Sequence, residues 1–217
     1  MNEQQIFDLY NEEIFFEDDF CISKSNKLVY QYLKNWPNWD FNIINIFGPA
    51  KSGKTFLLSL FEKKNLFTKI SSSELKKNNL DLLLSKKKLI IEDISNKIDE
   101  EVLFFIFNHF KNNNNYLIFS SIDDTVNLKF KLNDLSSRFK SIYNLEIFNP
   151  SDNLLYSILL KHLSNRQITL NLKLLNYILS RIERSYLAIN NFVKILDEQS
   201  LINKKKIDKK LINEILN

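Results

Sequence analysis

Short apolar runs alternate with longer stretches of helical periodicity through the first two thirds of the chain. The apolar runs predict β-strands at 42–47, 67–70, 88–92, 116–120 and 144–148. Apolar residues at three- and four-residue spacing predict helices at 26–35, 55–63, 73–85, 99–111 and 127–140. This alternation is typical of a parallel sheet with crossover helices. The pattern therefore predicts an α/β core with a five-stranded parallel sheet.

The pattern changes after Asn149-Pro150. Ser151-Asp152 suits the start of a helix, and from there to residue 217 only helical periodicity follows, enough for about four helices. We therefore expect an N-terminal segment at 1–25, an α/β core at 26–150 and a small all-helical domain at 151–217.

Composition narrows the class of protein. Hydrophobic residues make up 44% of the chain, enough for a substantial core, and the net charge of +4 is too small to indicate nucleic-acid binding. No apolar run approaches the roughly 18–20 residues that span a bilayer, and the acidic N-terminus does not resemble a secretory signal. A single cysteine, Cys21, suits a reducing compartment. We expect a cytoplasmic protein without membrane contact, in which the isolated His109 and His162 are structural.

The segment from Gly48 to Thr55 matches the phosphate-binding pattern G-x-x-x-x-G-K-[ST] at every fixed position. It holds both glycines of the chain, follows an apolar run and precedes a helical one. In such a loop, backbone N–H groups face phosphates, Lys54 reaches the β- and γ-phosphates and Thr55 ligates Mg²⁺. We expect ATP or ADP with Mg²⁺, contacted by Gly48, Pro49, Ala50, Lys51, Ser52, Gly53, Lys54, Thr55 and Phe56.

Two later strands end in polar residues that suit the same site. Glu92 is the candidate for ordering Mg²⁺, and Asp93 is the candidate for polarising the attacking water. An aspartate is usual at the position of Glu92, so hydrolysis by this chain is left open. Ser121, after the next strand, is placed to sense the γ-phosphate.

Arginine is scarce in a chain rich in lysine: it occurs only at Arg138, Arg166, Arg181 and Arg184. Arg138 lies just before the last predicted strand, where an arginine in AAA+ proteins points at the γ-phosphate of a neighbouring subunit and acts in trans. Arg184 opens a helix of the helical domain, from which it can reach the phosphates of its own chain. Arg181 is the alternative for this second role.

These features together resemble the Hda branch of the DnaA-related AAA+ proteins, as found in alphaproteobacteria. The resemblance covers nearly the whole chain, and its most selective parts are the Trp-Pro-x-Trp segment and the Arg-Ile-Glu-Arg-Ser segment. Besides the phosphate-binding loop it is carried by Gln4-Gln5-Ile6, Glu17-Asp18-Asp19-Phe20, Ser25-Asn26, Trp36-Pro37-Asn38-Trp39, Ile91-Glu92-Asp93, Leu135-Ser136-Ser137-Arg138, Pro150-Ser151-Asp152, Arg166-Gln167 and Arg181-Ile182-Glu183-Arg184-Ser185.

The resemblance implies a regulator of replication initiation. Such proteins dock on the DNA-loaded sliding clamp, the β subunit of the polymerase, and promote hydrolysis of ATP bound to DnaA. Arg138 would then act on DnaA-bound ATP, while a resident nucleotide, ADP on this reading, holds the productive shape. Any intrinsic ATPase would be weak and DNA contact indirect or weak, and a nucleotide-dependent homodimer is left open. The helical domain would be a lid, without room after it for a DNA-reading domain.

The same resemblance implies a clamp-binding peptide near the N-terminus. A glutamine followed by spaced apolar residues fills the clamp pocket as an extended segment. Two registers are possible here, and together they involve Gln4, Gln5, Ile6, Phe7 and Leu9.

Three alternative functions remain open. A helicase loader or clamp-loader subunit would form nucleotide-dependent assemblies larger than a dimer. A small-molecule kinase on a P-loop scaffold would transfer phosphate to a metabolite. A nucleotide-gated adaptor without turnover is the third alternative, and Glu92 at the metal position favours it.

Overall fold

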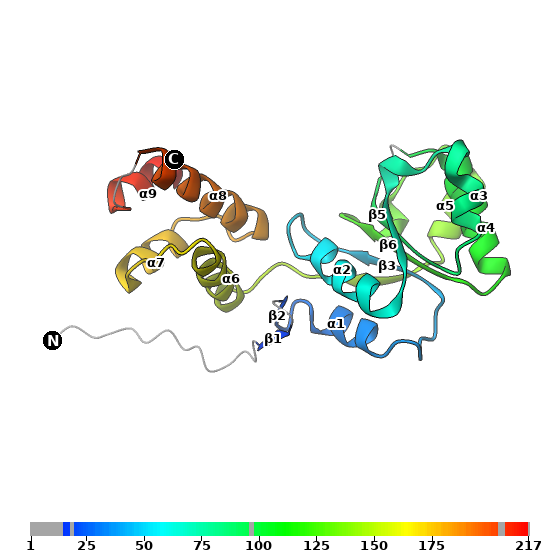
Figure 1. Cartoon of the computed structure of the whole chain (residues 1–217), viewed down its shortest axis with the longest axis horizontal. Helices are drawn as coiled ribbons and strands as arrows, with labels where there is room; N and C mark the ends of the chain where they lie inside the picture. Colours follow the sequence, from blue (N-terminus) through cyan, green and yellow to red (C-terminus); the bar gives the residue numbers. More distant parts are fainter. Residues whose placement is uncertain (1–14, 18–19, 96–97, 204–206, 217) are drawn as a thin grey trace. The chain divides into compact units, whose positions relative to one another are not determined.

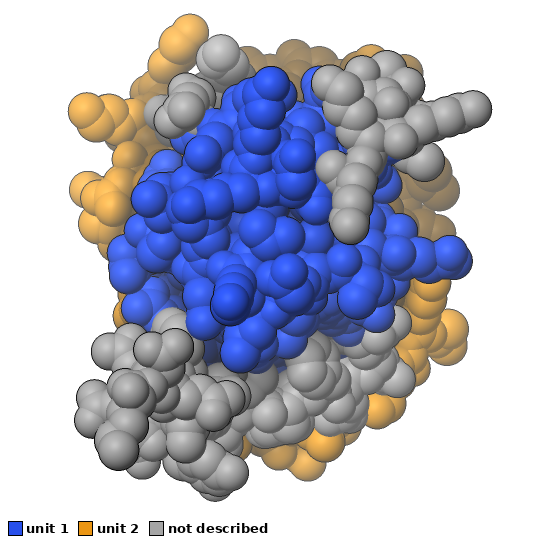
Figure 2. All heavy atoms as spheres, turned by 90° about the vertical axis from the view of Figure 1, so that its left-hand side faces the viewer, with its two compact units in different colours: residues 1–25, 149–217 blue, residues 26–148 orange. Residues whose placement is uncertain are grey.

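The computed structural model describes residues 15–17, 20–95, 98–203 and 207–216 of the 217-residue chain (Figure 1). The chain divides into two compact units, which Figure 2 colours separately. One unit is formed by Asn26–Phe148, and the other joins the described part of residues 1–25 to residues 149–217.

The unit Asn26–Phe148 contains a five-stranded sheet in the order β4-β5-β6-β3-β7. All four strand pairs are parallel, so every strand ends at the same edge of the sheet. The strands are β3 (Ile43–Phe47), β4 (Thr68–Ser71), β5 (Lys88–Ile94), β6 (Tyr116–Ser121) and β7 (Tyr143–Glu146). The predicted five-stranded parallel sheet is confirmed.

Helices cover both faces of this sheet. Those of the unit are α1 (Lys27–Lys34), α2 (Lys54–Asn65), α3 (Leu80–Leu84), α4 (Glu100–Asn112) and α5 (Asn133–Phe139). Three short 3₁₀ turns, η2 (Ser72–Glu74), η3 (Lys77–Asn79) and η4 (Thr125–Asn127), lie between them. Side chains of α3, α4 and α5 form one core with alternate residues of the central strands, such as Leu89 and Ile91 of β5. The opposite face of the sheet carries α1 and α2 (Figure 1).

Two predicted helices are shorter than the periodicity indicated. In 73–85 only α3 is α-helical, because the Asn79 side chain accepts from Lys76 N and donates to Glu74 O, which competes with helical hydrogen bonds. In 127–140 the helix begins only at Asn133. The Glu100 carboxylate accepts hydrogen bonds from the backbone N–H groups of Lys131 and Leu132, at 3.0 and 2.8 Å. These N–H groups are therefore unavailable to an earlier helical turn.

An aromatic cluster packs where the strands of this unit begin. Trp36 lies edge-on to Trp39 and to Tyr116, with ring centroids 4.9 and 4.4 Å apart. Trp39 stacks on Phe61, in the last part of α2, at 5.4 Å. The cluster therefore anchors the far end of the helix whose first residues follow the phosphate-binding loop.

In its described residues, the other unit combines a small hairpin with four helices. Strands β1 (Phe15–Glu17) and β2 (Phe20–Ile22) pair in antiparallel fashion. The helices are α6 (Asp152–Asn165), α7 (Leu172–Leu179), α8 (Tyr186–Asn203) and α9 (Lys209–Leu216). Their apolar faces enclose one core, and buried Cys21 packs with Leu154 and Tyr186 beside it. In the described residues, no helix has the length and apolarity needed to cross a bilayer.

Candidate nucleotide-binding site

The phosphate-binding loop connects β3 to α2, at the edge of the sheet where the parallel strands end. Gly48 has φ 151°, and a Cβ atom there would lie 2.4 Å from the carbonyl oxygen of Ile147, so only glycine fits. Gly53 has φ 92° and precedes α2 without a side-chain capping bond. The first N–H groups of α2 are therefore available to an anion, with the helix dipole in the favourable direction.

Lys54, the first residue of α2, folds back over this loop. Its ammonium donates to the carbonyl oxygens of Gly48 and Pro49, at 2.6 and 2.9 Å. Burial lowers the pKa of Lys54, and the neighbouring charge of Asp93 partly opposes this shift. Within the described residues, the buried Ser52 hydroxyl has no hydrogen-bond partner. A buried cation and an unpaired hydroxyl in one loop suit phosphate oxygens.

The other predicted loop residues surround this position. Pro49 and Ala50 are half-buried, Lys51 is exposed and has φ 64°, and Thr55 and Phe56 are exposed on the first turn of α2. The motif thus folds as the strand–loop–helix that phosphate binding requires.

Asp93 lies in an irregularity of β5, where its pairing with β6 shifts. Its φ is 58°, a conformation that costs a non-glycine residue about 1–3 kcal/mol. Two serines hold it there: Asp93 N–H donates to Ser120 Oγ at 3.2 Å, and Ser72 Oγ donates to Asp93 O at 2.8 Å. Because it is exposed and its charge acts on Lys54, Asp93 is available beside the phosphate loop.

Glu92 is buried, and its carboxylate already has a cationic neighbour. Oε2 lies 3.2 Å from the ammonium of Lys69 on the adjacent strand β4. The other oxygen, Oε1, is buried without a hydrogen-bond partner in the described part of the chain. That unpaired oxygen, together with the exposed Thr55, fits a hydrated divalent cation. The fit is partial because the other carboxylate oxygen, Oε2, is already paired with the ammonium of Lys69.

Ser121 is buried at the end of β6, in a polar network that sequence reasoning missed. Its hydroxyl donates to Asp123 O at 2.5 Å and accepts from Asn45 Nδ2 at 2.9 Å. The same amide donates to Asn144 Oδ1 on β7, also at 2.9 Å. A signal for this network existed in the sequence: Asn45 interrupts the apolar run Ile-Ile-Asn-Ile-Phe. No comparable signal marked Lys69.

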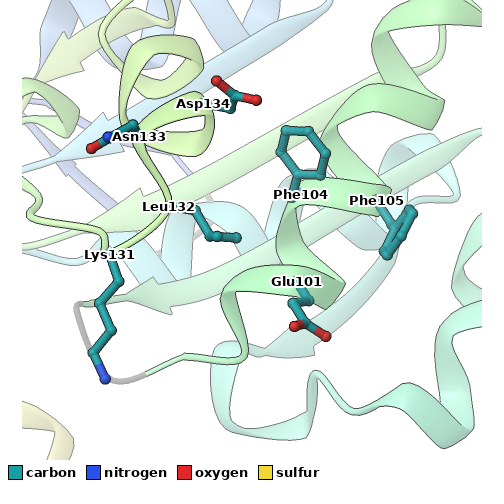
Figure 3. A pocket seen from close by; sticks show the side chains of 7 residues that line it. All are labelled: Glu101, Phe104, Phe105, Lys131, Leu132, Asn133 and Asp134. Atoms are coloured by element: carbon teal, nitrogen blue, oxygen red, sulfur yellow. The ribbon is translucent and has the colours of Figure 1, made fainter.

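Arg138 lies near the end of α5, half-buried, with its guanidinium carbon 5.2 Å from the centre of the Phe104 ring. Among the described residues no carboxylate pairs with it. Phe104 also lines a hollow of about 610 Å³ between the beginnings of α4 and α5 (Figure 3). The other residues around this hollow are Glu101, Phe105, Lys131, Leu132, Asn133 and Asp134. A ring stabilises the cation without neutralising it, so the fork stays able to bind an anion.

The two candidate arginines of the helical unit have different surroundings. Arg184, just before α8, is exposed and pairs with Asp152 of α6, its Nε lying 2.7 Å from Oδ1. The guanidinium carbon of Arg181 instead lies 3.9 Å from the ring centre of Tyr177, and the ammonium of Lys209 lies 4.7 Å from the same ring centre. The residues predicted to bind a clamp, between Gln4 and Leu9, lie outside the described residues.

Known proteins resemble this chain in sequence and in structure. DnaA of Campylobacter jejuni is 28% identical over 216 residues, which cover 84% of this chain and 49% of DnaA. Domain III of Thermotoga maritima DnaA superposes with a TM-score of 0.74 at 20% identity, covering 91% of this chain and 93% of that one. For AMPPCP-bound Aquifex aeolicus DnaA the TM-score is 0.71 at 20% identity, covering 90% and 68%. The fold is that of DnaA-like AAA+ proteins.

The likeness is to one part of DnaA, since the chain spans about half the length of the DnaA sequences that it matches. The five-stranded parallel sheet belongs to this AAA+ fold, and helices α6 to α9 agree with its lid. No protein-family model matches the chain. The sequence relatives that match are named DnaA, so the finer assignment to the Hda branch stays a prediction.

Proposed function

We propose that this chain is a nucleotide-binding AAA+ regulator of replication initiation that promotes hydrolysis of ATP bound to DnaA. The sliding clamp loaded on DNA is its second partner. Its own nucleotide, ATP or ADP, binds at the loop from Gly48 to Thr55 and stabilises the conformation that meets DnaA. The DnaA-like fold and the loop geometry support the nucleotide-binding part of this proposal.

Within the chain's own site, each residue has a separate task. Backbone N–H groups at the start of α2 and the ammonium of Lys54 bind the phosphates. Thr55 and the unpaired oxygen of Glu92 would hold Mg²⁺, which when bound supplies positive charge to the phosphate oxygens. Asp93 accepts a hydrogen bond from a water near the terminal phosphate.

The observation that carries the action on a partner is the position of Arg138. Its guanidinium rests on the ring of Phe104 and is neutralised by no carboxylate among the described residues. A lysine-rich chain has little need of arginine for an ordinary surface contact, whereas a planar, permanently charged fork suits a γ-phosphate. An arginine supplied in trans raises phosphoryl-transfer rates by about 10³–10⁵-fold.

The test is hydrolysis of ATP preloaded on DnaA, with DNA-loaded clamp present. Wild-type protein should stimulate the rate, and Arg138→Ala should abolish the stimulation. Arg138→Lys should recover little of it because an ammonium lacks the fork. Lys140→Ala removes an exposed cation from the same end of α5 and should leave stimulation unchanged. A folded, nucleotide-binding wild type that fails to stimulate hydrolysis would exclude this function.

A nucleotide-gated adaptor without turnover is the second candidate. The contact between Lys69 and Glu92 favours it, because a carboxylate already paired with an ammonium orders a metal less strongly. Both candidates, the regulator and the adaptor, predict that the isolated chain releases little phosphate from ATP. An active ATPase would release it readily. The adaptor alone predicts that Arg138→Ala has no effect on DnaA-bound ATP.

A further inference from the structure

Lys69 connects three elements around the carboxylate that the sequence assigns to a metal ion. It lies on β4, and its ammonium is 3.2 Å from Glu92 Oε2 on β5. The same ammonium donates to Ser59 Oγ on α2 at 2.6 Å and lies 3.7 Å from Glu62 Oε2. The side chains of Lys69 and Glu92 are only 18% and 11% exposed, so solvent screens their attraction weakly.

The position of Ser59 relates this ammonium to the phosphate loop. Ser59 lies one helical turn after Thr55, and its hydroxyl donates to Thr55 O at 2.7 Å. Residues four apart share a face of a helix. Lys69 therefore places a positive charge between Glu92 and the face of α2 that carries Ser59 and Thr55.

We propose that Lys69 is the resident cation of Glu92, and that this chain binds nucleotide phosphates with little dependence on Mg²⁺. The ammonium supplies part of the positive charge that a metal ion would bring, and it opposes the approach of a second cation to the same carboxylate. The unpaired Oε1 of Glu92 can still bind Mg²⁺ weakly. Nucleotide binding should therefore not depend strongly on Mg²⁺. This inference rests on the nucleotide site of the proposed function.

The consequence is an asymmetry between binding and hydrolysis. Lys54 and the N–H groups of α2 hold the phosphates whether or not a metal is present. A loosely held metal orders the terminal phosphate poorly, so the bound nucleotide persists. The chain then keeps its nucleotide as a structural ligand while it acts on a partner.

The test measures the affinity of the whole chain for a fluorescent ADP analogue, with Mg²⁺ and with EDTA. Wild type should show less than about a threefold change in Kd, and Lys69→Met should bind at least roughly tenfold more tightly with Mg²⁺ than without it. Lys77→Met removes the ammonium of an exposed pair with Glu101 in the same unit, at 2.6 Å, and should behave as wild type.

Lys69→Gln is the second variant, because it keeps a hydrogen-bond donor beside Glu92 while removing the charge. Circular dichroism establishes that each variant is folded, and Lys69→Gln should show the same gain of Mg²⁺ preference. A wild type that loses tenfold or more in affinity on chelation overturns the inference and leaves nucleotide binding standing. So does a folded Lys69→Gln variant as indifferent to Mg²⁺ as the wild type. Absence of binding in both conditions removes the nucleotide site together with the inference.

Discussion

Asn45 donates a hydrogen bond to the hydroxyl of Ser121 across 2.9 Å, deep inside the sheet. Both side chains are buried, and the other N–H of the Asn45 amide is used by Asn144. Strand β3 is thereby joined through side chains to both of its neighbours, β6 and β7. The hydroxyl predicted to sense the γ-phosphate already has partners within the protein.

Replacing Asn45 by alanine should therefore destabilise the protein. The change removes the two hydrogen bonds that the buried Asn45 amide donates to Ser121 Oγ and Asn144 Oδ1, at about 1–3 kcal/mol of unfolding free energy. Urea denaturation measures the change. Asn42→Ala is the matched control, because Asn42 donates to Asn114 O at an exposed position and should change stability by less than about 0.5 kcal/mol. Equal effects of the two substitutions would contradict a structural role for the network.

Gly48→Ala should disrupt the phosphate loop. Its Cβ would meet Ile147 O at 2.4 Å, in a backbone conformation that alanine rarely adopts, which costs about 1–3 kcal/mol. We expect a lower melting temperature and loss of nucleotide binding. Ala50→Gly, in the same loop, should be milder. A Gly48→Ala variant that binds ADP like wild type would show that the loop has another shape.

Nucleotide affinity should decrease as the pH rises. Burial lowers the pKa of Lys54 below 10.5, so its free ammonium loses the proton earlier than an ordinary lysine does. Phosphates bind the charged form, and affinity therefore falls once the pH exceeds this lowered pKa. Calorimetry between about pH 7 and pH 10 measures the slope. Lys54→Arg keeps its charge over this range, so a decline of equal size in that variant would assign the effect to another group.

The helical unit should lose stability in mild acid. Burial, aided by Arg166 and Lys161, lowers the pKa of His162 below 6.5. The unfolded chain then binds the proton more readily than the folded one, so stability present above pH 6.5 declines as the pH falls through the folded pKa. Thermal melts at neutral and acidic pH measure this decline. It should be smaller in His162→Gln, and an identical decline there would exclude His162 as the cause.

Replacing each of the two arginines near α8, Arg181 and Arg184, should have different effects on ADP affinity and on melting temperature. Arg184→Ala removes an exposed fork and should weaken ADP binding by roughly tenfold with little effect on melting. Arg181→Ala removes the cation over Tyr177 and should lower the melting temperature while leaving ADP affinity unchanged. The reverse pattern would make Arg181 the residue that contacts phosphate.

The five parallel strands and the phosphate loop follow from features that a sequence displays directly. Apolar runs mark the five strands, and the spacing of Gly48, Gly53 and Lys54 dictates the turn. The pairing of Lys69 with Glu92 was not predictable, because it depends on which strands become neighbours. The predicted helix at 73–85 is only partly formed for a different reason. The side chain of Asn79 competes locally for backbone groups that the hydrophobic pattern assigns to a helix.

The aromatic cluster at the start of the strands has a spectroscopic consequence. Trp36 and Trp39 are the two tryptophans of the chain, and both belong to the sheet unit. Intrinsic emission excited at the red edge therefore reports on that unit alone, while far-ultraviolet ellipticity reports on both. Because Trp39 stacks on the last part of α2, the fluorophore also sits at the opposite end of the helix that begins at the phosphate loop. The chain thus carries its own optical probe of the unit that contains the phosphate loop, without any label.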